Sequence, residues 1–193
     1  MGGALAGIDL EATFIHVRFK DSIAKDDGGA VYLKDSKVTV TNTTFAANNG
    51  IALLGTDLEA TFRDVLFEDN FARGDGGGAW LVSSHVTFEN STFSRNKAQF
   101  SGGALMGIRL EATFRAVLFE ENEAKKHAGG AWLEDSNATF ANSTFSSNKA
   151  EVDGGALYCY RCGTEHCLLS HVICVLPQVW ICKNKCVSQT TSL

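Results

Sequence analysis

Six cysteines are the most reactive side chains of the chain, and all of them lie near its end. They are Cys159, Cys162, Cys167, Cys174, Cys182 and Cys186. Six thiols in one short segment are typical of a small disulfide-bonded unit, whose connectivity the spacing does not determine. The alternative is a Zn²⁺ site that combines Cys159 and Cys162 with His166 or His171, but a second C-x₂-C pair is missing. We therefore expect disulfides here, in a cap or at the start of a further module.

Paired carboxylates are the other residues whose type and spacing suit catalysis. Adjacent acidic residues occur at Asp26-Asp27, Glu68-Asp69 and Glu120-Glu121. Glycoside hydrolysis needs two carboxylates that converge on one sugar, and a Ca²⁺ site needs several oxygen ligands. The last two pairs occupy one position of a repeat, which is typical of a solvated turn, and the five histidines share no such position. The sequence thus predicts no catalytic site, no cofactor and no resident metal.

Four Asn-x-Ser/Thr sequons mark sites for N-linked glycans in a eukaryotic secretory route. They begin at Asn42, Asn90, Asn137 and Asn142. Duplication alone can account for three of them, because Asn42, Asn90 and Asn142 share one repeat position. An Arg73-Gly74-Asp75 tripeptide, of the kind that integrins bind, lies in a glycine-rich loop, where such matches arise by chance.

The composition is that of a globular chain of 193 residues, with 45% hydrophobic and 20% charged residues. Its net charge of −5 disfavours nucleic-acid binding, which normally requires a basic face. The first residues lack the basic segment of a signal peptide, and Asp9 and Glu11 interrupt their apolar stretch. The longest apolar run, from Cys167 to Cys182, is broken by Pro177 and is too short to span a bilayer. We expect no transmembrane segment in this chain.

The elements that position these residues come from a repeat with a usual step of 26 residues and one step of 22. One aromatic column comprises Phe14, Phe62, Phe88, Phe114 and Phe140, with Val40 in the second copy. Another comprises Phe19, Phe45, Phe67, Phe93, Phe119 and Phe145. An asparagine lies three residues after each of the last five, which gives a third column of Asn48, Asn70, Asn96, Asn122 and Asn148. A Gly-Gly-Ala motif lies between successive copies, with Gly50-Ile51-Ala52 as its degenerate form beside the short step.

Within each copy, apolar and polar residues alternate, as in a strand with one buried face. In the segment 111–115, for example, Ala112 and Phe114 face one side and the polar residues face the other. Short strands that recur at a constant length form a parallel β-solenoid, whose equivalent residues stack about 4.8 Å apart. We therefore predict an all-β fold, a parallel β-helix of about six coils over residues 1–156, followed by a Cys-rich segment over residues 157–193.

Stacking gives the columns a structural role rather than a ligand-binding one. The phenylalanines form two internal aromatic ladders, and the asparagine amides hydrogen-bond from coil to coil. The Gly-Gly pair permits a bend with positive φ and a close approach of backbones. The segments 58–70 and 86–98 recur 52 residues later, which indicates that a two-coil unit was duplicated.

The alternating GGA[L/W/V] and FxxN motifs resemble the repeats of chlamydial polymorphic membrane proteins. The first motif occurs at Gly28–Val31, Gly102–Leu105 and Gly154–Leu157, with tryptophan variants at Gly77–Trp80 and Gly129–Trp132. The second occurs at Phe45–Asn48, Phe67–Asn70, Phe93–Asn96, Phe119–Asn122 and Phe145–Asn148. The resemblance implies a right-handed, single-stranded β-helix of the pectin-lyase type that serves as the passenger of a surface adhesin. Because the chain starts inside such a motif, we expect a fragment of a larger secreted or outer-membrane protein.

A ligand would contact the outward positions, which also form columns. One column consists of Thr13, Thr39, Thr61, Thr87, Thr113 and Thr139, and charged columns flank it. We expect a non-enzymatic module, extracellular or on the cell surface or outer membrane, that binds a protein or glycan of a host or neighbouring cell. Open solenoid ends also favour end-to-end self-association. A carbohydrate-active β-helix enzyme, a polysaccharide lyase or hydrolase, is the alternative, and the charged flanks disfavour ice binding by the threonines.

Overall fold

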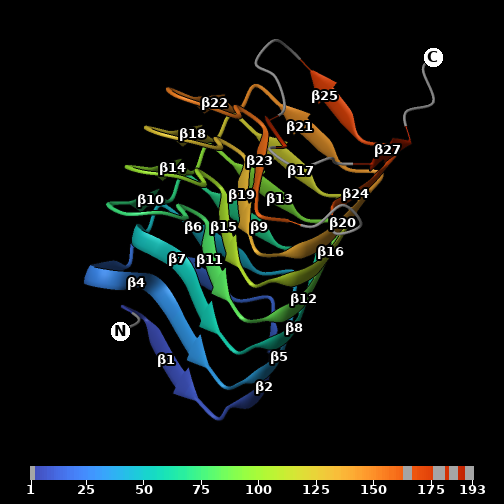
Figure 1. Cartoon of the computed structure of the whole chain (residues 1–193). Helices are drawn as coiled ribbons and strands as arrows, with labels where there is room; N and C mark the ends of the chain where they lie inside the picture. Colours follow the sequence, from blue (N-terminus) through green and yellow to red (C-terminus); the bar gives the residue numbers. More distant parts are fainter. Residues whose placement is uncertain (1–2, 163–166, 176–180, 183–186, 190–193) are drawn as a thin grey trace.

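The computed structural model of the protein describes residues 3–162, 167–175, 181–182 and 187–189. Short strands joined by tight turns wind into successive coils, and the described residues contain no helix. Figure 1 shows these coils stacked along one axis, with the chain colours running in order from one end of the stack to the other. The predicted all-β, parallel solenoid fold is confirmed.

Three parallel sheets form the faces of the coils, and we name them A, B and C. Sheet A contains β1 (Leu5–Ile8), β4 (Ile23–Lys34), β7 (Asn49–Thr56), β11 (Ala79–Val82), β15 (Leu105–Ile108), β19 (Ala131–Glu134), β23 (Leu157–Tyr160) and β26 (Ile181–Cys182), with a branch of β10 (Phe71–Ala72), β14 (Lys97–Ala98), β18 (Glu123–Ala124) and β22 (Lys149–Ala150). Sheet B contains β2 (Glu11–Ile15), β5 (Lys37–Thr41), β8 (Glu59–Arg63), β12 (His85–Glu89), β16 (Glu111–Arg115), β20 (Asn137–Ala141), β24 (Cys167–Ser170) and β27 (Val187–Gln189). Sheet C contains β3 (Arg18–Lys20), β6 (Thr44–Ala46), β9 (Leu66–Glu68), β13 (Thr92–Ser94), β17 (Leu118–Glu120), β21 (Thr144–Ser146) and β25 (Ile173–Val175).

We number the coils by their sheet B strand, so that coil one contains β2 and coil seven contains β24. Neighbouring strands of sheet B pair in register from β2 to β20. Phe88, for example, lies opposite Phe62 on one side and Phe114 on the other. Each residue of these sheet B strands therefore lies above its repeat equivalent, which turns a column of the sequence into a column of the structure.

The single short step of the repeat lies in coil three. Strands β4 and β7 pair Ile23 with Asn49 and Val31 with Leu53, so eight residues of β4 face four of β7. The missing loop brings two backbones together: a Cβ on Gly29 would lie 2.6 Å from the carbonyl carbon of Gly50, which has a φ of 127°. Only glycine fits this approach, and coil three thus keeps its register despite the deletion.

The two phenylalanine columns form stacked ladders inside the solenoid. Ring centroids of successive coils are 4.4–5.4 Å apart in the column of Phe62, Phe88, Phe114 and Phe140. They are 4.5–5.0 Å apart in the neighbouring column, from Phe19 to Phe145. Phe14 and Phe19, at the end of the stack, are half-buried, whereas their equivalents from coil three to coil six are buried almost completely. Each buried ring contributes about 1.5–3 kcal/mol through removal of its surface from water.

The asparagine column is a buried ladder of hydrogen bonds at the turn after sheet C. Asn96 accepts, on Oδ1, the backbone N–H of Asn70 at 3.2 Å and the Asn70 side-chain amide at 2.8 Å. Its own Nδ2 donates to the Phe67 carbonyl at 2.9 Å and to the Asn122 Oδ1 at 3.0 Å. An amide both donates and accepts, so one residue type can repeat this pattern in every coil.

Replacement of Asn96 by alanine should destabilise the protein by about 2–5 kcal/mol, because at least two buried groups of neighbouring coils lose their partners at about 1–3 kcal/mol each. Urea unfolding followed by circular dichroism measures this change. Asn137→Ala on the exposed face of β20 is the matched control and should change stability by less than about 0.5 kcal/mol. Equal losses in the two variants would contradict the ladder's role.

The two-coil period of the sequence has a packing cause at the corner between sheets A and B. Odd coils place a glycine three residues before a leucine, and even coils place a leucine three residues before a serine. The pairs are Gly7/Leu10, Leu33/Ser36, Gly55/Leu58, Leu81/Ser84, Gly107/Leu110 and Leu133/Ser136. The serine hydroxyl accepts the leucine N–H of the coil below, as between Ser136 Oγ and Leu110 N at 2.9 Å. Large and small side chains thus alternate along the axis and fill the corner at constant volume.

The Gly-Gly-Ala motifs recur between successive copies of the repeat, but they are not all equivalent in space. Ala79 of coil four pairs with Leu105 rather than with Ala104, so the motif of coils four and six is displaced by one residue. At the turn that precedes sheet A, positive φ falls on Gly76, Gly102, Ala128 and Gly154, one residue in each of coils four to seven. The residue that follows must be glycine because there is no room for a side chain. A Cβ on Gly103, for example, would lie 2.4 Å from the Gly129 carbonyl oxygen.

Gly107→Ala should cost about 1–3 kcal/mol through overpacking. A Cβ at this position would lie 2.8 Å from Leu110 Cδ2 and 2.9 Å from Leu133 Cδ2. Gly74→Ala is the control, because nothing lies within 4 Å of the added carbon. We expect denaturant midpoints to fall for the first variant only. An unchanged midpoint for Gly107→Ala would show that the corner can expand.

The solenoid continues into the segment that the sequence assigns to a Cys-rich unit. Strands β23, β24 and β25 pair with β19, β20 and β21, and they form coil seven. Strands β26 and β27 extend sheets A and B by one further position. The boundary expected between residues 156 and 157 stays a prediction.

Candidate functional site

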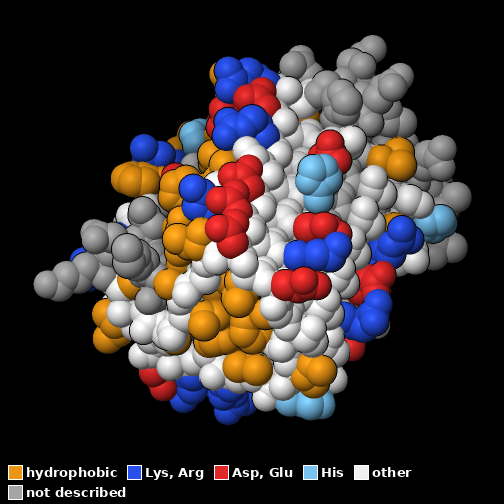
Figure 2. Space-filling model, turned by 90° about the horizontal axis from the view of Figure 1, so that it is seen from below, with side chains coloured by type: hydrophobic (Ala, Val, Ile, Leu, Met, Phe, Trp, Pro, Cys, Tyr) orange, Lys and Arg blue, Asp and Glu red, His pale blue; other side chains and the backbone are white. Residues whose placement is uncertain are grey.

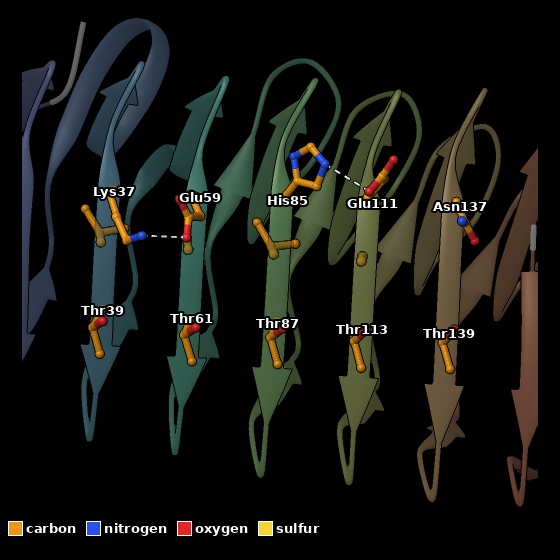
Figure 3. Close-up of a pocket in the computed structure, with 14 residues that line it drawn as sticks. Lys37, Thr39, Glu59, Thr61, His85, Thr87, Glu111, Thr113, Asn137 and Thr139 are labelled. Carbon is orange, nitrogen blue, oxygen red and sulfur yellow. Dashed lines mark hydrogen bonds and ion pairs between the residues drawn. The ribbon is translucent and has the colours of Figure 1, made fainter.

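The outer face of sheet B carries a shallow groove of about 450 Å³ that runs across the strands (Figure 3). Because inward and outward residues alternate, the phenylalanine column inside sheet B leaves the threonine column outside. The groove is lined by Lys37, Val38, Thr39, Glu59, Ala60, Thr61, His85, Val86, Thr87, Glu111, Ala112, Thr113, Asn137 and Thr139. Five threonine hydroxyls thus lie in one file, beside a second file of charged and polar side chains.

Acidic, basic and histidine side chains alternate along the charged file (Figure 2). Lys37 Nζ lies 2.7 Å from Glu59 Oε1, and His85 Nε2 lies 2.9 Å from Glu111 Oε2 (Figure 3). The hydrogen bond from Lys37 to Glu59 raises the pKa of the lysine. All four side chains are about two-thirds exposed, so these pairs contribute little to stability. These side chains remain accessible to a polar ligand.

The acidic pair Glu68-Asp69 is neutralised by an arginine of the next coil. Arg95 Nε lies 2.9 Å from Asp69 Oδ1, and its terminal nitrogen contacts Glu68. These hydrogen bonds raise the pKa of the Arg95 guanidinium, and the bond to Asp69 has the larger effect. The pair therefore forms an ion-paired turn rather than a pair of convergent catalytic carboxylates.

An outward column of sheet A is largely apolar, and the sequence analysis did not identify it. It consists of Tyr32, Leu54, Trp80, Met106, Trp132 and Tyr158. Trp132 and Tyr158 stack with centroids 4.4 Å apart. The indole nitrogens of Trp80 and Trp132 are buried, and no described residue is their hydrogen-bond partner. The sequence does contain a signal for this column, because a tryptophan, Trp80 or Trp132, directly follows each displaced Gly-Gly-Ala motif.

His127 lies next to this apolar column. It belongs to another file of residues, spaced by 26, that includes Ser101 and Asp153. Its Nδ1 lies 3.3 Å from Asp153 Oδ2, within ion-pair distance but without hydrogen-bond geometry. Its ring lies 5.4 Å from that of Trp132. The order Ser, His, Asp is that of a hydrolase triad, but within the described residues no hydrogen bond joins the Ser101 hydroxyl to the imidazole.

A family model described as "Right handed beta helix region" matches residues 6–169, most of the chain. The chain belongs to the right-handed β-helix family. This finding confirms the β-helix part of the sequence resemblance and supplies the handedness, which spacing alone does not give. A search of curated proteins returns no match. Among the described residues, no helix is long and apolar enough to cross a membrane, and no three His, Cys, Asp or Glu side chains gather as a metal ion would require.

The sequons of the β-helix lie in two different environments. Asn42, Asn90 and Asn142 are exposed at the corner between sheets B and C, each with a φ of about +50°. Asn137 is exposed on β20, where it lines the groove. A glycan on Asn137 would therefore cover part of the groove, whereas glycans on the other three would project from one edge.

Two of the six cysteines have described side chains. Cys159 and Cys162 are 2% and 3% exposed, and their side chains are hydrogen-bonded to each other. The backbones of Cys167, Cys174 and Cys182 lie on β24, β25 and β26. Their side chains, and all of Cys186, lie outside the described residues, as do His166 and the side chains of Asp26 and Asp27.

The Arg73-Gly74-Asp75 tripeptide is held in the loop before β11. The Oδ1 atom of Asp75 accepts the backbone N–H of Ser101 at 2.7 Å. Burial raises the pKa of this carboxyl, and the hydrogen bond offsets part of that effect. The aspartate is thus engaged within the protein, which disfavours its use in integrin binding.

Asp75→Asn should alter how stability depends on pH. A carboxyl whose pKa is raised on folding contributes stability at low pH that is lost as pH rises through its folded pKa. The amide does not ionise, so the variant should be more stable than the wild type above this pKa, and the difference should shrink towards pH 3. Thermal melts across this range test the sign, with Asp64→Asn on an exposed corner as control. A difference that is constant with pH would refute the burial effect.

Proposed function

We propose that this β-helix is a non-enzymatic binding module whose ligand, a protein or a glycan, lies in the groove of sheet B. The observation that carries the proposal is the file of five threonine hydroxyls beside the charged file, in register over five coils. Hydroxyls donate and accept, and the charges of both signs are accessible. Such a surface suits an extended polar ligand whose groups recur at the coil spacing of about 4.8 Å.

The exposure of the groove's carboxylates supports binding over catalysis. A general acid works near neutral pH when burial raises its pKa, as in glycosidases. Glu59 and Glu111 are about two-thirds exposed, and Lys37 and His85 accompany them. A groove of this kind holds a ligand without supplying the desolvated acid that glycoside hydrolysis needs.

The resemblance to polymorphic membrane proteins extends the proposal to location and partners. We place the module outside the cell or on its surface or outer membrane, as part of a larger secreted or outer-membrane adhesin. Its partner would be a surface protein or glycan of a host or neighbouring cell.

Glu59 and Glu111 also support an alternative, a carbohydrate-active enzyme. They line the same groove, two coils apart, on either side of His85. Two carboxylates of one groove are the minimum for glycoside hydrolysis. Release of reducing ends or unsaturated products from acidic or neutral polysaccharides would establish this function in place of the first.

Negative charge placed among the threonines should weaken binding. We expect Thr87→Glu with Thr113→Glu to reduce binding to immobilised glycans, or to cultured cells, by at least about tenfold. Thr56→Glu, on the outer face of sheet A, should retain wild-type binding. Circular dichroism checks that both variants are folded. Equal binding by all three proteins would move the ligand site away from the groove, and binding by none of them to any glycan or cell would count against an adhesin.

A further inference from the structure

Coil seven breaks the two-coil packing rule at the corner where β23 ends. By its place in the alternation it should carry a glycine followed after three residues by a leucine, as Gly107 and Leu110 do in coil five. It carries Cys159 and Cys162 instead, and the register confirms that Cys159 occupies the column of Leu133 and Gly107. Two thiols therefore share the space that one leucine side chain fills in the other odd coils.

The equivalent corners of coils one and five show how close these two positions lie. A Cβ on Gly107 would lie 3.4 Å from Leu110 Cβ, and one on Gly7 would lie 3.4 Å from Leu10 Cβ. The Cβ atoms of a disulfide are about 3.5–4.5 Å apart. Cysteines at these two positions can thus be joined with only a small adjustment of the backbone.

The contacts of the two thiols agree with this geometry. Cys159 is hydrogen-bonded to the Cys162 side chain, and this bond lowers the pKa of Cys162 to about 7. The Cys162 sulfur also lies 3.7 Å from the carbonyl oxygens of Tyr160 and Leu133. Both side chains are almost completely buried, so their reaction requires a transient opening of the corner.

We propose that Cys159 and Cys162 form a reversible disulfide within coil seven, closed by exchange with a small disulfide such as oxidised glutathione. The Cys162 thiolate attacks one glutathione sulfur and releases the first glutathione thiolate. The Cys159 thiolate then attacks the Cys162 sulfur, forms the internal disulfide and releases the second. The two cysteines lose two protons and two electrons, and glutathione disulfide gains the electrons.

This inference rests on the packing of coil seven and is independent of the groove. It selects one pairing among the six cysteines. The competing pairing is Cys159 with Cys182, because these residues are register partners on β23 and β26. The competing chemistry is zinc binding, which would need two further ligands beside these thiols.

Peptide mapping of the full chain distinguishes these outcomes. The protein is equilibrated with glutathione buffers from reducing to oxidising, alkylated, and cleaved after Lys, Arg and Glu. Segment 152–161 then contains Cys159 alone, and segment 162–165 contains Cys162 alone. We expect these two segments to be linked under oxidising conditions and separated again by dithiothreitol. Linkage of 152–161 to segment 166–183, or full alkylation of both thiols in every buffer, would overturn the proposal.

Cys162→Ser is the matched control, because the chain itself places a serine at this corner in coil six. Ser136 is buried there and donates to the Glu134 carbonyl at 2.7 Å. The variant should fold, lose the linked peptide and lose any dependence of its melting temperature on the glutathione buffer. Zinc content is measured in parallel. Zinc that survives dialysis and protects both thiols in the wild type, but not in Cys162→Ser, would show a metal site instead.

Discussion

Parallel stacking in register is the constraint on which the rest of the structure depends. Since the residues of the asparagine column lie on one another, each buried amide must be satisfied by the same group one coil away. Asparagine meets this demand, because its amide accepts from the coil below and donates to the coil above. The phenylalanines fill the apolar interior by stacking their rings from coil to coil. Both ladders hold the coils at one spacing, and the outer surface inherits that spacing.

Identical side chains stacked at a corner would not fill it evenly. The corner between sheets A and B is filled because large and small side chains alternate from one coil to the next. Gly107 leaves room for Leu110 and Leu133, whose side chains converge on the space a Cβ would occupy. Ser136 in the next coil is small and binds the Leu110 N–H. A single coil carries only half of this arrangement, which explains why the duplicated unit comprises two. Coil seven departs from it with two cysteines, and there a packing site becomes a site for sulfur chemistry.

The interior columns maintain the stacking, so the outward residues can differ from one coil to the next. Threonine repeats along the groove, while the neighbouring file changes from Lys37 to Glu59, His85 and Glu111. The outer column of sheet A changes from Leu54 to Trp80 and Met106. A rigid frame with variable outward residues is what a binding module requires, because a ligand is recognised by the sequence of side chains along the axis.

The sequence by itself determined the coil length, the alternation of the strands and the residues of the phenylalanine and asparagine columns, because these recur in almost every coil. It also identified the two-coil unit and the threonine file. Only the tertiary structure decided which glycines are equivalent, since the shift of Ala79 against Ala104 depends on how each loop enters sheet A. The contact of His127 with Asp153, the apolar column around Trp132 and the proximity of Cys159 to Cys162 likewise depend on loop and corner geometry. A turn with positive φ redirects the chain by an amount that composition does not reveal.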